Sequence, residues 1–159
     1  MQLRAFMLDA KHYNLPRMLE EWRWLIPQQH TPLFVSALGD WVFGAPDGSL
    51  WCLSVLEGDY FQIALNGAEY NKLNKSEEWL NKTFIAGWQA IAAGHGLEPS
   101  PDQCIGWKVH PRIGGQLKPD NLQLFDMEVY QSIMGQLHRQ LRPAKPQQEK
   151  DKPWFKFWR

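Results

Sequence analysis

The sequence predicts an α+β fold in which an antiparallel strand meander packs with helices and a strand–helix unit follows. Between residues 33 and 64, four short apolar and aromatic runs alternate with tight-turn residues, as in antiparallel strands. Elsewhere, apolar residues recur every three or four positions, which is typical of helices with one buried face. A brief alternating run at 122–124 stands directly before the last of these helical stretches.

The first helix is expected over residues 15–26. Pro16 suits the first helical position because the missing N–H would have been unpaired there anyway. One apolar face then recurs at helical spacing, and the helix should end before Pro27. The residues of that face are Leu15, Met18, Leu19, Trp22, Leu25 and Ile26.

Four strands should follow, joined by short turns. Pro46 presets φ in the turn at 45–48, where Gly48 tolerates a positive φ, and residues 57–59 have the same character. Such short connections make consecutive strands antiparallel neighbours. The expected strands are 33–37, 40–44, 50–56 and 60–64.

Two helices are expected next. Residues 66–73 resemble a short helix, and Ser76 can cap a longer one that ends at the Gly94-His95-Gly96 stretch. The buried stripe of the longer helix should contain Leu80, Phe84, Trp88 and Ile91.

The last unit combines the strand at 122–124 with a helix that Asp126 can cap. That helix carries one apolar face made of Met127, Tyr130, Met134, Leu137 and Leu141. From residue 143 the chain becomes polar and then ends in aromatic residues. We therefore expect one α+β domain over residues 1–142, with a polar linker and an aromatic tail over 143–159.

Composition restricts the class of protein. Lys plus Arg and Asp plus Glu both number 17, so the chain lacks the excess positive charge typical of nucleic-acid binders. Two unpaired cysteines fit a reducing compartment, and no apolar run has the length of a signal peptide or a membrane span. We therefore expect a cytoplasmic protein without a transmembrane segment. The sequence leaves its oligomeric state open.

A survey of reactive side chains predicts no catalytic residues, no metal site and no cofactor. Cys104 and His110 are close in sequence, but a buried structural thiol is the commoner state of a free cysteine. The five histidines lack a chelating spacing. The pair Gly114-Gly115 fits neither a phosphate loop nor a dinucleotide fingerprint, and instead indicates a tight turn or a close backbone approach.

Protein–protein interaction then becomes the main hypothesis. A strand or edge segment between Trp107 and Gln116 would place Lys108, His110 and Arg112 on one face, forming a basic stripe for an acidic partner surface. A solvated edge strand protected by its charges explains the same pattern. The tail adds candidate contacts at Trp154, Phe155, Phe157 and Trp158, which could equally fold back or touch a membrane.

Residues 105–141 carry a family resemblance. Ile105-Gly106-Trp107, a proline, the glycine pair, Asn121-Leu122, Asp126 and the helix at 132–141 follow one another in the order of a known domain. The stretch resembles the C-terminal domain of bacterial type VI secretion immunity proteins, the kind paired with DNase effectors. Gln116 stands where that pattern has an acidic residue, and the tail lies outside the pattern.

The resemblance implies a non-enzymatic protein that binds and neutralises a cognate protein toxin in the cytoplasm. It implies structural roles for Gly114, Gly115, Asn121 and Asp126, and no cofactor. Two alternatives stay open: a small-molecule enzyme that uses Cys104 and His110 with His138, and a membrane or scaffold adaptor that uses the 154–158 tail.

Overall fold

A computed structural model describes residues 4–142 of the chain. Five strands form one antiparallel sheet in the order β1-β2-β3-β4-β5, and two more pair antiparallel as β6-β7. The predicted meander is therefore confirmed, with β1 as an additional edge strand. The strands are β1 (Met7–Asp9), β2 (Thr31–Ser36), β3 (Trp41–Gly44), β4 (Leu50–Ser54), β5 (Asp59–Ala64), β6 (Gln103–Trp107) and β7 (Leu122–Asp126).

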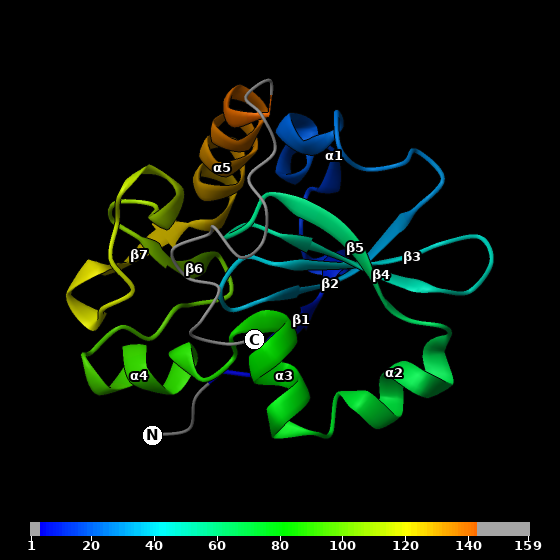
Figure 1. The fold of residues 1–159 in the computed structure, drawn as a ribbon, viewed down its shortest axis with the longest axis horizontal. Coiled ribbons are helices and arrows are strands. Elements are labelled where there is room, and N and C mark those ends of the chain that lie inside the picture. The colour runs from blue at the N-terminus through cyan, green and yellow to red at the C-terminus, as the bar shows by residue number, and fades with distance from the viewer. Residues whose placement is uncertain (1–3, 143–159) are drawn as a thin grey trace.

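Helices lie on both sides of the five-stranded sheet, as Figure 1 shows. On one side are α1 (Leu15–Met18) and α5 (Met127–Leu141), and on the other are α2 (Gly67–Leu73), α3 (Glu77–Phe84) and α4 (Trp88–Gly94). The short 3-10 turns are η1 (Ala10–His12), η2 (Glu20–Trp22), η3 (Pro111–Ile113) and η4 (Pro119–Asn121). The predicted α+β class is confirmed.

The central sheet buries both of its faces. In β3, Trp41 and Phe43 point into the core under α1 and α5, whereas Val42 points into the core over α2 and α3. Neighbouring β4 alternates in the same way, with Leu53 in the first core and Cys52 in the second. Because successive side chains of a strand point to opposite faces, one strand serves both cores.

The predicted helix over 15–26 is wrong in its length. The helix ends at Met18, Leu19 leaves helical geometry at φ −110° and ψ 5°, and η2 follows as a separate turn. The reason is the close contact of η2 with α5. A Cβ added at Gly135 would lie 2.6 Å from the carbonyl oxygen of Glu21, so the two backbones nearly touch.

Trp22 of η2 fixes this contact. Its side chain is fully buried, and its Nε1 donates a hydrogen bond to Oε1 of Gln131 at 3.0 Å. The Gln131 Nε2 in turn donates to the carbonyl oxygen of Gly39 at 2.7 Å. One buried amide therefore joins η2, α5 and the β2–β3 turn.

The single long helix expected after Ser76 is also wrong. Ser76 does cap α3, but Ile85 adopts a left-handed conformation at φ 48° and separates α3 from α4. The break allows Phe84 and Trp88 to pack in two different hydrophobic clusters. Ile91, expected in the buried stripe, is 40% exposed.

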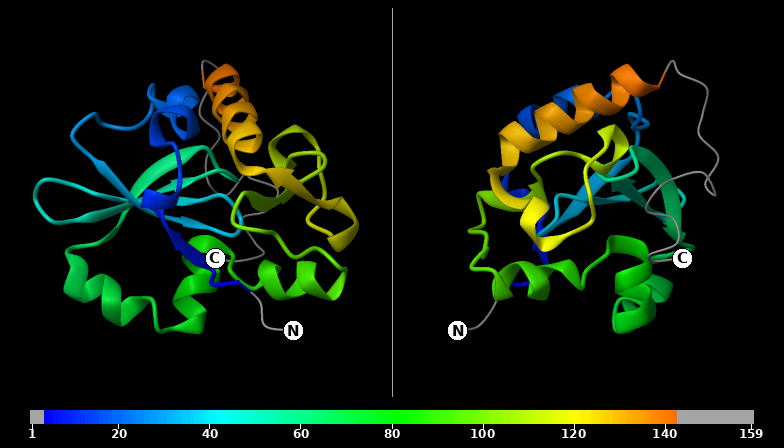
Figure 2. Two further views of the ribbon diagram at one scale, coloured as in Figure 1. Left: turned by 180° about the vertical axis from the view of Figure 1, so that it is seen from behind. Right: turned by 60° about the vertical axis from the view of Figure 1, so that its left-hand side comes forward.

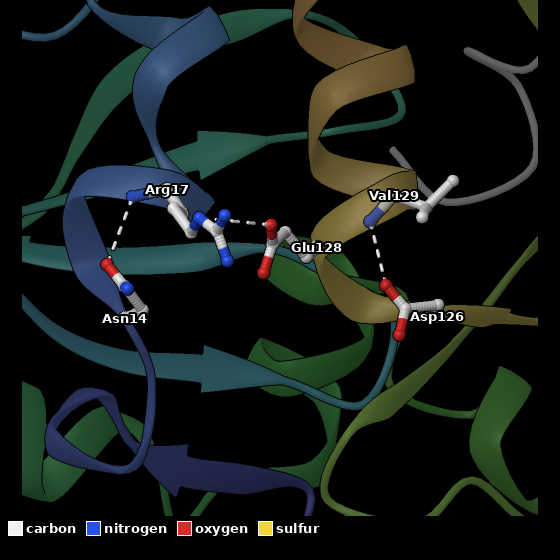
Figure 3. Close-up of polar contacts among 5 residues, drawn as sticks. All are labelled: Asn14, Arg17, Asp126, Glu128 and Val129. Carbon is white, nitrogen blue, oxygen red and sulfur yellow. Dashed lines mark hydrogen bonds and ion pairs between the residues drawn. The ribbon is translucent and has the colours of Figure 1, made fainter.

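The C-terminal strand–helix unit is confirmed. Asp126 ends β7 and caps α5, because its Oδ1 accepts a hydrogen bond from the Val129 N–H at 2.9 Å (Figure 3). Met127, Tyr130 and Met134 are buried against η2 and the sheet. Among residues 4–142, no helix has the length and apolar character needed to cross a bilayer.

Candidate partner-binding site

The segment from Lys108 to Gln116, called here the 108–116 loop, follows β6 and contains η3. In Figures 1 and 2 it lies beside α5, on the side opposite α1. It contains most of the described residues that were predicted from the sequence to bind a partner. It also holds both members of the glycine pair.

Asn121 pins the two ends of this loop together. Its Oδ1 accepts from the Val109 N–H at 3.0 Å, and its Nδ2 donates to the carbonyl oxygens of Val109 at 2.8 Å and Gln116 at 2.9 Å. The Asn121 carbonyl accepts from the Lys108 N–H at 2.7 Å. The side chain thus satisfies loop backbone groups that no strand pairs.

Gly115 closes the loop by backbone contact. Its N–H donates to the His110 carbonyl at 3.0 Å, and a Cβ at this position would overlap the carbonyl of Val109. The expectation of a close backbone approach is therefore confirmed for Gly115. Gly114 differs, because it has open space around it and a φ of +102°, which side chains rarely adopt.

A buried turn at residues 54–58, called the 54–58 turn, accepts hydrogen bonds from side chains of the loop. The Val55 carbonyl accepts from Nε2 of His110 at 3.1 Å and from Nε2 of His138 at 2.7 Å. A carbonyl only accepts, so both rings carry their proton on Nε2. Arg112 adds a bond from Nη1 to the Glu57 carbonyl at 3.1 Å.

Both histidines are buried at this contact. Burial lowers the pKa of His110 to about 3, with a further contribution from the nearby His138, and burial lowers the pKa of His138 to about 4. The rings meet edge to face with centroids 5.1 Å apart. The His110 Nδ1 accepts from the Arg112 N–H at 3.0 Å, so both ring nitrogens of His110 have partners.

The predicted strand that would align Lys108, His110 and Arg112 on one face is wrong. β6 ends at Trp107, and the chain then bends into η3. His110 points inward, Arg112 is half-buried, and Lys108 alone of the three is exposed. Hydrogen bonds from Asn121 replace the strand pairing that would have kept the segment extended.

The apolar residues of the loop point outward instead. Val109 is 47% exposed and Ile113 is 56% exposed, whereas Trp107 is buried with its ring edge-on to Trp88 at 5.1 Å. Sequence periodicity missed Val109 and Ile113 as surface residues because it assumed a strand. Partner contact by Trp107, Lys108, His110 and Arg112 stays a prediction, and Trp154, Phe155, Phe157 and Trp158 lie outside the described residues.

Cys104 does not join the histidines. It is fully buried in the core beneath α5, where burial raises the pKa of its thiol. Both histidines use Nε2 on Val55, and no hydrogen bond links either of them to Cys104 within residues 4–142. The same part of the chain contains no group of three or more His, Cys, Asp or Glu side chains placed to hold a metal ion.

A comparison with protein families matches residues 64–138 to the family described as T6SS immunity protein Tdi1, C-terminal. The match contains Gly114, Gly115, Asn121 and Asp126. Residues 64–138 are therefore similar to that type VI secretion immunity family. The resemblance expected from residues 105–141 is thereby confirmed.

The matched Tdi1-type domain begins well before the motifs that the sequence made recognisable. It runs from the last residue of β5 through α2, α3 and α4 to His138 of α5. It therefore contains the whole 108–116 loop, whereas β1–β4, α1 and η2 precede it. A comparison with curated proteins found no match.

Proposed function

We propose that this chain is a non-enzymatic immunity protein that binds a cognate type VI toxin in the cytoplasm and blocks its activity. The match of residues 64–138 to the Tdi1 C-terminal family carries the proposal. Type VI immunity implies toxin neutralisation. Burial raises the pKa of the Cys104 thiol and lowers the pKa of His110 to about 3 and of His138 to about 4, so these groups are poorly matched to nucleophilic or general-base catalysis near neutral pH.

The 108–116 loop is the proposed contact surface within the Tdi1-type domain. Asn121 holds the loop backbone, and the 54–58 turn holds the His110 and Arg112 side chains, so little conformational entropy would be lost when a partner binds. Exposed Val109 and Ile113 provide apolar anchors, and exposed Lys108 favours an acidic patch on the partner.

We further propose that the toxin is a DNase, the effector type paired with the family that the sequence resembles. A DNase needs a positively charged cleft for the phosphate backbone. The 108–116 loop contains Lys108 and Arg112 and no carboxylate. The loop would therefore bind beside such a cleft rather than imitate DNA within it.

Co-expression with the product of the neighbouring toxin gene tests the proposal. We expect the full chain to restore survival and to co-purify with the toxin. The Cys104→Ala variant should protect equally well, because occlusion of a toxin needs no nucleophile. Toxicity that persists, with no co-purification, would overturn the immunity assignment.

A second comparison tests the contact surface. The Val109→Asp and Ile113→Asp variants should lose protection, whereas Leu65→Asp, which changes an exposed apolar residue of the β5–α2 connection, should keep it. Equal protection by all three would exclude the loop as the contact. Plasmid degradation by the purified toxin, blocked by this chain, tests the DNase assignment separately.

A further inference from the structure

An open hollow of about 600 Å³ lies between the α1–η2 segment and the end of the central sheet. This volume falls within the range of roughly 300–1,000 Å³ typical of ligand pockets. The walls are mainly apolar and include Leu15, Leu19, Ile26, Pro27, Pro32 and Phe43. All of its lining residues precede residue 64, so the hollow lies wholly outside the family match.

Local contacts restrict the segment that forms one wall of the hollow. Asn14 caps α1 through the Arg17 N–H at 3.3 Å, and the Arg17 side chain reaches Glu128 of α5 at 3.8 Å (Figure 3). Pro16, Pro27 and Pro32 each have a locked φ.

The sheet side of the hollow is equally constrained. Phe43 is buried and meets the ring of Tyr60 edge-on at 5.5 Å. The Nδ1 of His30 lies 2.6 Å from the Tyr60 hydroxyl, which orients the imidazole at the wall. A preformed site of this kind binds without first paying for rearrangement.

Arg23 gives the hollow its charge. It is exposed, it lines the hollow, and its guanidinium makes no hydrogen bond or ion pair with residues 4–142. An arginine beside apolar walls is suited to a carboxylate that accompanies an apolar side chain. No Asp or Glu lines the hollow.

We propose that this hollow receives an extended segment of the toxin, with an apolar side chain against the partly exposed Leu19 and Ile26 and an adjacent carboxylate on Arg23. The inference rests on the proposed immunity function and adds a second contact outside the Tdi1-type domain. Such a contact would give this chain a means of selecting its own toxin that does not depend on the shared domain.

The charge of the hollow favours a partner segment over the tail of this chain. Residues 153–159 contain Lys156 and Arg159 and no Asp or Glu, so their charges would repel Arg23. A second copy of the chain is the other possible occupant. Measurements of binding and of oligomeric state distinguish the tail and a second copy from a toxin segment.

The test measures the affinity of the full-length chain for the catalytically inactivated toxin encoded by the neighbouring gene, by isothermal titration calorimetry. Arg23→Glu should weaken binding at least about tenfold, because like charges at an interface are strongly unfavourable. Pro16→Glu should also weaken binding by placing a carboxylate at the rim. It should lower Tm only slightly, because the loss of the proline constraint is partly offset by an acidic residue in the first turn of a helix.

The matched control is Lys75→Glu, a charge reversal at an exposed position between α2 and α3. It should bind within about twofold of the wild type, since surface charges distant from an interface have little effect. Wild-type affinity in both Arg23→Glu and Pro16→Glu would overturn the hollow as a contact while leaving the immunity function intact. A wild-type chain that fails to bind the toxin would instead remove the function on which the inference rests.

Two further results would overturn the proposal that a toxin segment occupies the hollow. Tighter toxin binding after combined Trp154→Ala and Trp158→Ala substitution would assign the hollow to the tail of this chain. A dimer of the free chain, observed by light scattering and lost in Arg23→Glu, would assign it to a second copy.

Discussion

At the scale of the residue, Gly115 shows how one absent side chain shapes the candidate site. A Cβ there would overlap the carbonyl of Val109, which already accepts a hydrogen bond from Asn121. Gly115→Val should therefore lower the free energy of unfolding by more than about 1 kcal/mol, measured by urea denaturation.

Gly67→Val is the matched control for this substitution. Gly67 is the first residue of α2, and a Cβ there meets no atom within 4 Å. Its cost should stay within about 0.5 kcal/mol, as is usual for surface sites. Similar costs for the two variants would show that crowding at Gly115 is not what requires glycine.

At the scale of the element, α5 is the helix that joins the matched domain to the central sheet. Met134 is buried in the core with Trp22, whereas Leu137, predicted from the sequence as a buried residue, is only half-buried at the edge of that core. Met134→Ala should cost about 2–5 kcal/mol of stability, and Leu137→Ala should cost less, because part of its side chain already contacts water.

Ile133 provides the comparison on the same helix. Its side chain is 48% exposed, so Ile133→Ala should change the free energy of unfolding by less than Leu137→Ala. Chemical denaturation of the three variants gives the ranking. A larger loss at Ile133 than at Met134 would mean that the buried face of α5 is assigned wrongly.

At the scale of the whole molecule, three buried groups determine how stability depends on pH. Burial raises the pKa of Asp40 from 3.8 to about 8, while the histidine pKa values fall from 6.5 to about 3 for His110 and about 4 for His138. Between about pH 4 and 6.5, both histidines are protonated in the unfolded chain, whereas only Asp40 of the three groups is protonated in the folded chain. The unfolded chain therefore binds one proton more, and the free energy of unfolding rises with pH. Between pH 6.5 and 8 the folded chain alone retains a proton, and stability falls. Thermal unfolding should therefore show a maximum Tm near pH 6.5.

Asp40→Asn isolates the alkaline half of this profile. The asparagine Oδ1 still accepts the Val55 N–H that Asp40 accepts at 2.9 Å, but it cannot ionise. Its Tm should stay level between pH 6.5 and 8, where the wild type declines. An equal decline in the variant would show that Asp40 does not control that range.

Features that depend on local chemistry could be predicted from the order of the residues. Alternating residues and turn residues predicted the β2–β5 meander. Ser76 and Asp126 cap helices as predicted, and Gly115 lies against the backbone. These features follow from side-chain spacing and from the hydrogen bonds of neighbouring residues, which the order of residues largely fixes.

The positions of the helix breaks and the exposure of individual side chains depend on contacts between distant parts of the chain. Ile85 takes a left-handed conformation, and Phe84 and Trp88 then pack in separate cores. The first helix ends before η2, whose Glu21 backbone packs closely on Gly135 of α5. His110 turns inward because Val55, 55 positions earlier in the chain, offers it a carbonyl. That bond leaves Val109 and Ile113 exposed, and the hollow beside Arg23 likewise exists only where α1 and η2 meet the sheet. Contacts between residues distant in sequence override local periodicity because burial and hydrogen bonding contribute more free energy than local propensity does.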